Sequence, residues 1–250
     1  MEISVTHIGT ATVLLEVGGV RLVTDPVFDA APAVYDYGPV VLRSTQGPAI
    51  DIADLPPVDA VLLSHDDHVD NLDATGRTLL PGRPVLTTPS GAKRLGDRAV
   101  GLAPWATHEL SSNGTTLRII GTPGLHGPIG EVTGFIVEVP GEEEAIYISG
   151  DTVYIPDLDK IARRFKIGTA LLHLGAARFE AFGGGELISM DAAQGAALAR
   201  SLQARRVLPI HYSSWEHFTE ERGEISARFA AAGLADRLHW LTPGLAESFD

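Results

Sequence analysis

The segment of residues 61–73, VLLSHDDHVDNLD, constrains the fold more than any other part of the chain. It begins with an apolar run typical of a buried strand, and two histidines and four acidic residues follow directly. Buried charges are costly unless they are paired or bound to a metal. Such a cluster at the end of a buried strand therefore indicates a cation site.

The composition is that of an acidic globular protein. Hydrophobic residues make up 44% of the 250 residues and charged residues 20%, so we expect a single domain over residues 1–250 with a substantial core. The net charge of −13 disfavours nucleic acid and anionic membrane surfaces as partners, because both require a basic face. The chain has no cysteine, so a metal could bind only histidine, aspartate or glutamate.

The sequence carries no signal for secretion or membrane insertion. The first residues, MEISV, lack the basic and apolar regions of a signal peptide, and no apolar run approaches the roughly 20 residues that span a bilayer. We therefore expect a cytoplasmic protein that acts on a small-molecule substrate. Formation of a homo-oligomer is left open.

The pattern of apolar runs predicts an α/β fold. Two successive halves in which strands precede helices predict a pair of sheets with helices on both outer sides. The Pro- and Gly-rich segment of residues 25–57 is expected to be an ordered loop near the active site, because long loops in compact domains are usually functional. The predicted strands are 3–8, 11–17, 20–24, 58–63, 84–88, 115–120, 132–139, 145–148, 169–174 and 206–210, and the predicted helices are 72–80, 90–95, 156–165, 191–202 and 220–232.

Candidate metal ligands recur shortly after four of these strands. They are His65, His68, His126, Asp151 and His211. In layered α/β folds the strand ends meet at one rim, so these side chains are expected to converge. Imidazole and carboxylate groups suit Zn²⁺, Mn²⁺ or Fe, and catalytic zinc sites keep one position open for water. The alternatives are a turn residue for Asp151 and a buried, backbone-bonded histidine for His211.

The order of these motifs resembles the metallo-β-lactamase fold superfamily. The motifs are HDDHVDN at residues 65–71, His126 between glycines, SGDT at 149–152 and PIHY at 209–212. THIGTATVLLE at 6–16 and TDP at 24–26 are similar to its lactonase-like group of zinc-dependent hydrolases, which includes ascorbate-6-phosphate lactonase and N-acylphosphatidylethanolamine phospholipases. The resemblance covers nearly the whole chain and implies a four-layer αβ/βα sandwich, with two facing mixed sheets covered by helices.

The central motif departs from the family pattern His-x-His-x-Asp-His. Read from His65, the position of the second histidine holds an aspartate; read back from Asp70, the first histidine becomes Asp66 and the last becomes Asn71. An insertion of one residue, with His65 and His68 as the two histidines of the first metal, keeps the most ligands and is the interpretation we adopt. The amide of Asn71 is a weaker zinc ligand than imidazole, so the sequence leaves open whether the site binds one ion or two.

The resemblance implies a role for each candidate residue. His65, His68 and His126 would hold one metal, Asp151 would bridge two, and Asp70 and His211 would serve the second. A bound metal lowers the pKa of water to about 7 and so provides a hydroxide that attacks a carbonyl or phosphoryl centre. Asp70 is then the candidate proton acceptor or water-orienting group. If the second metal is missing, His211 could instead donate a hydrogen bond or a proton to the substrate.

Three functions are compatible with these residues. The first is a metal-dependent hydrolase, with Zn²⁺ as the favoured ion and Mn²⁺ or Fe as alternatives, that cleaves a small-molecule ester, lactone, amide or phosphodiester. The second is a degenerate family member that binds a ligand or partner without hydrolysis, which the asparagine at position 71 favours. The third, a nuclease of the same fold, is disfavoured by the acidic charge.

Several of these residues also have simpler structural interpretations. Asp70 and Asn71 are placed to cap a helix that begins at Leu72, and we favour the cap over the ligand for Asn71. Asp66 and Asp67 are expected to be helix-terminus or supporting acids. His7 and His173 are expected to be hydrogen-bonded core histidines, and His108, His217 and His239 to be surface residues.

Overall fold

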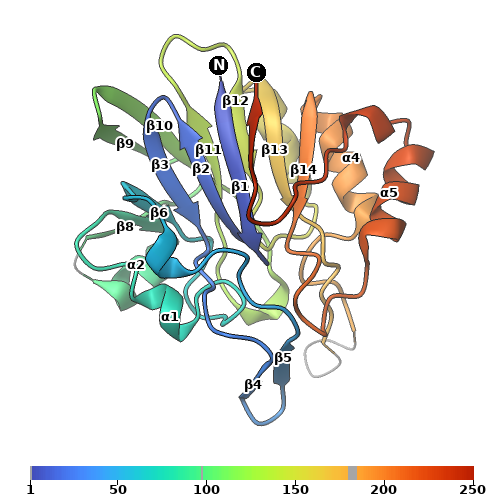
Figure 1. Cartoon of the computed structure of the whole chain (residues 1–250). Coiled ribbons are helices and arrows are strands. Elements are labelled where there is room, and N and C mark those ends of the chain that lie inside the picture. Colours follow the sequence, from blue (N-terminus) through green and yellow to red (C-terminus); the bar gives the residue numbers. More distant parts are fainter. Residues whose placement is uncertain (1, 97, 180–184) are drawn as a thin grey trace.

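In the computed structural model, residues 2–96, 98–179 and 185–250 are described. Their strands form two large sheets that face each other, and α-helices cover both outer sides (Figure 1). The predicted α/β sandwich of two mixed sheets covered by helices is confirmed.

The first sheet has the strand order β15-β1-β2-β3-β6-β7-β8 within the described ranges. Its strands are β1 Ile3–Gly9, β2 Thr12–Val17, β3 Val20–Thr24, β6 Ala60–Leu62, β7 Val85–Thr87, β8 Ala99–Gly101 and β15 Ala246–Phe249. β1, β2, β3 and β15 pair antiparallel, whereas β3, β6, β7 and β8 are parallel. The parallel pairing brings the carboxyl ends of β3 and β6 to the same edge.

The second sheet has the order β14-β13-β12-β11-β10-β9 in the same part of the chain. Its strands are β9 Thr107–Ser112, β10 Thr115–Thr122, β11 Gly134–Glu138, β12 Ala145–Ile148, β13 Ile167–His173 and β14 Arg206–Ile210. β12, β13 and β14 run parallel, so the residues that follow them also share one edge.

The main core lies between the two sheets. Alternate residues of each strand face it, because successive side chains of a strand point to opposite faces. Leu15 and Leu62 of the first sheet belong to this core together with Phe135 and Leu171 of the second. Leu14, next to Leu15, instead joins the apolar layer on the outer side of the first sheet. Burial of one such side chain stabilises the fold by about 1.5–3 kcal/mol.

The helices cover the outer faces of the sheets. They are α1 Ala74–Arg77, α2 Pro89–Leu95, α3 Asp159–Ala162, α4 Ala192–Leu202 and α5 Arg222–Ala231. α4 begins where the carboxylate of Asp191 accepts the backbone N–H of Gln194 at 2.8 Å, and its buried side is rich in alanine. Within the described residues, no helix has the length and apolar character needed to cross a membrane.

A hairpin of β4 Ala33–Asp36 and β5 Val41–Ser44 projects from the end of the molecule opposite the chain termini (Figure 1). It belongs to the segment of residues 25–57, which is ordered as predicted. The hairpin itself was not predicted, because each strand has only four residues and β4 has no buried position to mark it as a strand.

Two predicted helices are shorter than expected. The helix predicted over 72–80 is limited to α1, since Asp73 accepts the backbone N–H of Gly76 at 2.6 Å and starts the helix there. The helix predicted over 156–165 begins with a 3₁₀ turn at Pro156–Leu158 and ends at Ala162. The short or polar strands β8, β9 and β15 lacked a recognisable apolar pattern and were missed.

Candidate metal centre

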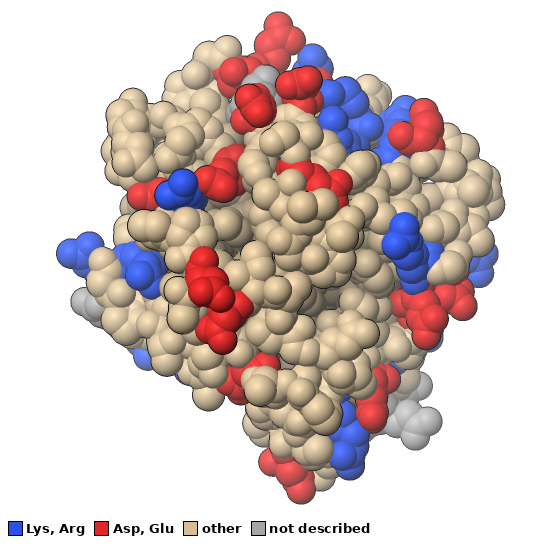
Figure 2. Space-filling model, in the orientation of Figure 1, with Lys and Arg blue, Asp and Glu red and all other residues tan. Residues whose placement is uncertain are grey.

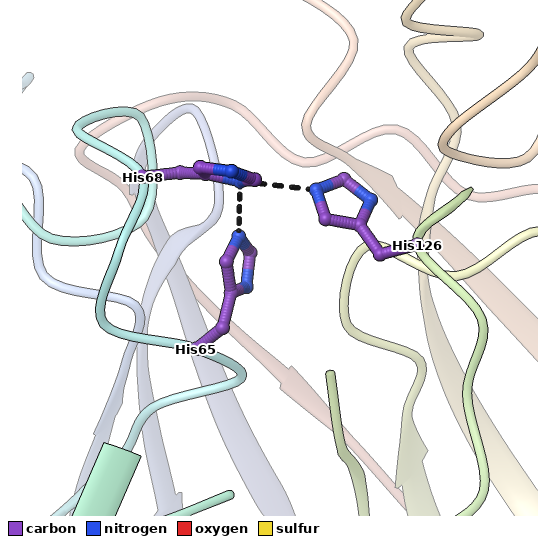
Figure 3. A group of neighbouring side chains, drawn as sticks. All are labelled: His65, His68 and His126. Atoms are coloured by element: carbon purple, nitrogen blue, oxygen red, sulfur yellow. Dashed lines mark hydrogen bonds between the residues drawn. The ribbon is translucent and has the colours of Figure 1, made fainter. Parts of the chain in front are cut away.

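Three histidines converge on one point (Figure 3). His65 and His68 lie in the loop after β6, and His126 lies in the loop after β10, just before a 3₁₀ turn at Gly127–Ile129. The Nδ1 atom of His68 lies 2.8 Å from Nε2 of His65 and 3.0 Å from Nε2 of His126. Three imidazole nitrogens facing one point match the protein ligands of a catalytic zinc site with an open fourth position. We refer to these residues as the three-histidine cluster.

The outer ring nitrogens of two of these histidines are held by the protein. Nδ1 of His126 contacts the backbone oxygen of Ile188 at 2.6 Å, and because a carbonyl only accepts, this nitrogen carries the proton and leaves the Nε2 lone pair free. Nδ1 of His65 lies 2.8 Å from the hydroxyl of Ser64. Burial and repulsion from His68 lower the pKa of His126 to about 3, and burial lowers the pKa of His65 well below its ordinary value. Both imidazoles are therefore neutral at pH 7, the state that binds a metal.

A second group, the aspartate–histidine cluster, consists of Asp70, Asp151 and His211. Nε2 of His211 lies 3.4 Å from Oδ2 of Asp70 and 3.3 Å from Oδ2 of Asp151. All three side chains are buried, and neither ring nitrogen of His211 has a hydrogen-bond partner among the described residues. Buried polar atoms are normally paired, so two carboxylates around an unpaired imidazole fit a bound cation.

The backbone holds this cluster in a strained geometry. His211 has a φ of +55°, in the left-handed region that few non-glycine residues adopt, and its N–H donates to the backbone oxygen of Thr10 at 2.7 Å. Gly150, which precedes Asp151, has a φ of +65°, and a Cβ there would lie 2.7 Å from the backbone oxygen of Thr133. Glycine adopts this φ without strain, whereas the strain at His211 is of the kind that is concentrated at functional sites.

The two carboxylates of the cluster have opposite pKa shifts. Burial raises the pKa of Asp151 well above its ordinary value, and repulsion from Asp70 and Asp25 adds to the rise. Burial would also raise the pKa of Asp70, but the neighbouring imidazoles of His211 and His217 outweigh it and hold that pKa well below the ordinary value. A metal ion beside both groups would offset the repulsion and keep both ionised. The donor set therefore fits a metal.

Asn71 is fully buried and does not cap a helix, so the cap prediction is wrong. Asp73 performs that role two residues later. The amide nitrogen of Asn71 donates to the hydroxyl of Ser64 at 3.4 Å, and a hydrogen bond from Asn71 lowers the pKa of Asp151. Its Oδ1 atom has no partner among the described residues. Asn71 thus supports Asp151 and is not part of either cluster.

Asp66 is a supporting acid, as predicted. Its carboxylate accepts from Arg94 Nε at 3.0 Å and from Nη2 at 2.5 Å, and its backbone oxygen accepts from Arg77 at 2.7 Å. These contacts fix the loop between the two histidines that follow β6. Asp67 is more exposed and lies 3.7 Å from Arg94.

His217 was predicted to be a surface residue, and this prediction is wrong. Its side chain is only 8% exposed, and its Nε2 atom lies 3.1 Å from Oδ2 of Asp70. The loop after β14 folds back over the site and packs this ring against Phe179 and Trp215. The aromatic neighbours in YSSWEHF were the available signal, because a histidine among buried aromatic residues is itself easily buried.

His173, at the end of β13, is buried as predicted but lacks the expected hydrogen bonding at one nitrogen. Its Nδ1 atom lies 3.1 Å from the hydroxyl of Ser149. Its Nε2 atom lies 3.5 Å from Oδ2 of Asp25 and 3.9 Å from Oδ1 of Asp151. His7 is likewise buried as predicted, with Nε2 3.1 Å from the backbone oxygen of Thr10, but its Nδ1 atom has no hydrogen-bond partner among the described residues.

A pocket of about 390 Å³ opens directly onto both clusters. Its lining includes His68 and His126 of the first cluster and all three residues of the second. Residues of the β4–β5 hairpin also line it, which places the segment of residues 25–57 beside the site as predicted. A volume of this size is typical of small-molecule sites.

The fold and the two clusters define the class of the protein. An αβ/βα sandwich that carries a three-histidine cluster beside an aspartate–histidine cluster is a metallo-β-lactamase-type architecture built for metal-assisted hydrolysis. Residues 20–212 match the beta-lactamase superfamily domain, and the chain belongs to that family. The predicted superfamily is confirmed.

Relatives of similar length are metal-dependent hydrolases by name. One from Nitratidesulfovibrio vulgaris is 27% identical over 260 aligned positions, covering 100% of this chain and 97% of that protein. One from Pyrobaculum neutrophilum is 24% identical over 241 aligned positions, which cover 94% of this chain and 95% of that protein. The solved structure of isothiocyanate hydrolase from Delia radicum gut bacteria has the same fold, with a TM-score of 0.83 and 24% sequence identity. The superposition covers 98% of this chain and 99% of that one. The predicted class, a metal-dependent hydrolase, is confirmed, whereas the lactonase-like group stays a prediction.

Proposed function

We propose that residues 1–250 form a single-domain, zinc-dependent hydrolase that cleaves an ester, lactone, amide or phosphodiester bond in a small molecule. The observation that carries this proposal is the convergence of the two clusters, from loops remote in sequence, on the floor of one pocket. The names of the relatives support the reaction class.

The donor atoms suggest which residues hold which ion. His65, His68 and His126 would hold the first, and three imidazoles favour Zn²⁺, with Mn²⁺ or Fe as weaker alternatives. Asp70, Asp151 and His211 would hold a second ion more weakly, because Asn71 replaces an imidazole by an amide. A metal held at these sites supplies Lewis acidity and a water of lowered pKa.

The protein's own groups position the reactants. The imidazoles of His211 and His217 fix the position of Oδ2 of Asp70. Because the pKa of Asp70 is lowered, its carboxylate stays ionised and is better suited to accept a hydrogen bond from the attacking water than to take up its proton. Burial lowers the pKa of His211 to about 4, so this residue is neutral at pH 7 and acts as a ligand or hydrogen-bonding group. We assign Asp70 to orient the water.

A small-molecule substrate also agrees with the surface charge. On the face shown in Figure 2, Lys and Arg side chains are interspersed with Asp and Glu side chains. The net charge of −13 opposes the approach of a polyanion.

The proposal is tested by loading the purified protein with Zn²⁺ and measuring turnover of an aryl ester, a γ-lactone, an aryl phosphodiester and, because of the structural neighbour, an isothiocyanate. Turnover that a chelator abolishes and Zn²⁺ restores is expected. His126→Ala should lose it, whereas His239→Ala, whose histidine pairs with Glu247 and is 43% exposed, should not. Turnover that persists after complete metal removal would contradict the proposal.

The asparagine at position 71 also motivates an alternative, a binding protein without hydrolytic activity, and the names of the relatives argue against it. It predicts that zinc-loaded protein binds a metal-chelating ligand in the pocket but turns over no member of the panel. Chelator-sensitive turnover of any member excludes this candidate.

A further inference from the structure

The pocket has a polar floor and apolar walls. The two clusters form the floor, where the scissile bond would lie. The walls are built mainly from Val40, Leu42, Val69, Ile129, Phe179 and Ile188. The backbone oxygen of Ile188 accepts from Nδ1 of His126, so this part of the apolar wall is fixed directly beside a metal-site histidine.

The described lining of this pocket contains no lysine or arginine that could pair with an anionic group of a substrate. Residues 1, 97 and 180–184 contain neither type in the sequence. The arginines near it in the chain are engaged elsewhere. Arg94 binds Asp66, Arg43 faces Glu216 at 3.8 Å, and Arg178 donates to the backbone oxygen of Gly185 at 3.4 Å.

The carboxylate of Asp67 adds negative charge to a pocket lining without lysine or arginine among the described residues. Asp67 lines the pocket with 36% of its side chain exposed and lies 3.7 Å from Arg94, whose guanidinium also binds Asp66, and the carboxylates of the floor add further negative charge. Metal ions would offset the floor carboxylates at the scissile bond. An anionic group elsewhere on a substrate would have to leave water for an apolar wall without a partner, which is unfavourable.

We infer that the substrate carries an uncharged, compact apolar group on its scissile bond and has no second anionic group. This inference rests on the proposed function, since it concerns the same site. It excludes substrates with a phosphate or carboxylate remote from the bond that is cleaved, such as sugar phosphates. It selects neutral alkyl or aryl esters, lactones, amides or comparable small electrophiles.

Two hydroxamates with the same chelating head test this inference by binding alone. Butanohydroxamic acid ends in a methyl group, whereas succinic monohydroxamic acid ends in a carboxylate. Isothermal titration calorimetry of the zinc-loaded protein should show the neutral compound binding at least about 30-fold more tightly. Equal binding, or tighter binding of the carboxylate, overturns the inference. Absence of binding by either compound overturns the assignment of this pocket as the ligand site.

A charge placed in the wall provides the matched test. Ile129→Arg places a cation in the apolar wall. It should reduce the ratio between the affinities for the neutral and the carboxylate hydroxamate about tenfold. Leu245→Arg adds the same charge at a residue that is 55% exposed and outside the pocket lining, and should leave the ratio unchanged. Equal effects of the two variants would show that net charge, not the wall, sets the preference, and would overturn the inference.

The two proposals fail in different ways. If the neutral hydroxamate is preferred but zinc-loaded protein turns over no substrate, the proposed hydrolysis fails and the inference about the pocket stands. If kcat/KM for a phenyl hemisuccinate equals that for phenyl butyrate, the hydrolase stands and the inference fails.

Discussion

The Nε2 atom of His217 lies 3.1 Å from Oδ2 of Asp70, and the same oxygen lies 3.4 Å from Nε2 of His211. One carboxylate oxygen of the aspartate–histidine cluster thus faces two imidazoles from the segment that follows β14. Because Asp70 is buried, these contacts determine where its second oxygen points. His217 is therefore a positioning residue for this cluster.

Replacement of His217 by alanine is expected to lower kcat/KM about 10- to 100-fold, because Asp70 loses the contact that orients it. The three-histidine cluster should keep its ion, which elemental analysis of the same sample measures. The control is His239→Ala, since His239 also pairs with a carboxylate, that of Glu247 at 2.8 Å, but at the surface. Similar losses in both variants would show that His217 has no special role.

Replacement of His126 by alanine should remove about one zinc ion per chain, because a site with two imidazoles binds zinc far more weakly than one with three. Native mass spectrometry of the zinc-loaded variant counts the ions directly. His108→Ala is the comparison, since His108 lies in strand β9, away from the pocket lining. An unchanged ion count in His126→Ala would rule out the three-histidine cluster as a metal site.

Replacement of Asn71 by histidine should tighten the second ion at least about tenfold, since imidazole is a better zinc ligand than an amide. Competition with a chelator of known zinc affinity measures the change. Asn71→Ala, which loses the contact to Asp151, should instead weaken this ion. Thermal unfolding of both variants checks that the buried position accepts the substitution. Identical affinities in the two variants would argue against a second ion beside residue 71.

The metal-free protein should lose stability as the pH falls below about 6.5. Folding lowers the pKa of His126 from 6.5 to about 3, so between these values the unfolded chain binds more protons than the folded one. The contribution of His126 to the free energy of unfolding is therefore highest above pH 6.5, and it falls by about 2 kcal/mol between about pH 7 and pH 5. Urea unfolding at both pH values measures the fall, which should be smaller in His126→Gln. A fall of the same size in that variant would locate the effect elsewhere.

Much of the fold followed from the sequence because most core strands are short apolar runs next to strong turn signals. Gly18 and Gly19, with φ of +58° and +80°, form the predicted hairpin turn between β2 and β3. The edge strands β9 and β15 are partly polar, because one face of an edge strand meets solvent, and they escaped prediction. Helix α1 was overextended because an apolar residue, Leu72, preceded its true cap, Asp73.

The predicted candidate residues were brought together because each follows a strand end at the shared edge of its sheet. His217 was not predicted, since its position depends on how the loop after β14 folds back, and that path is set by tertiary packing against Phe179 and Trp215. The apolar pocket walls could not be predicted from the sequence pattern either, because they combine residues from segments far apart in the chain.

An anomalous-scattering map from crystals of the zinc-loaded protein, recorded at the zinc edge, tests the central claim most directly. A peak within about 2.0–2.1 Å of Nε2 of His65, Nδ1 of His68 and Nε2 of His126 is the expected result, with a weaker peak beside Asp70, Asp151 and His211. A map without a peak at the three-histidine cluster, from protein that still hydrolyses its substrate, would contradict it.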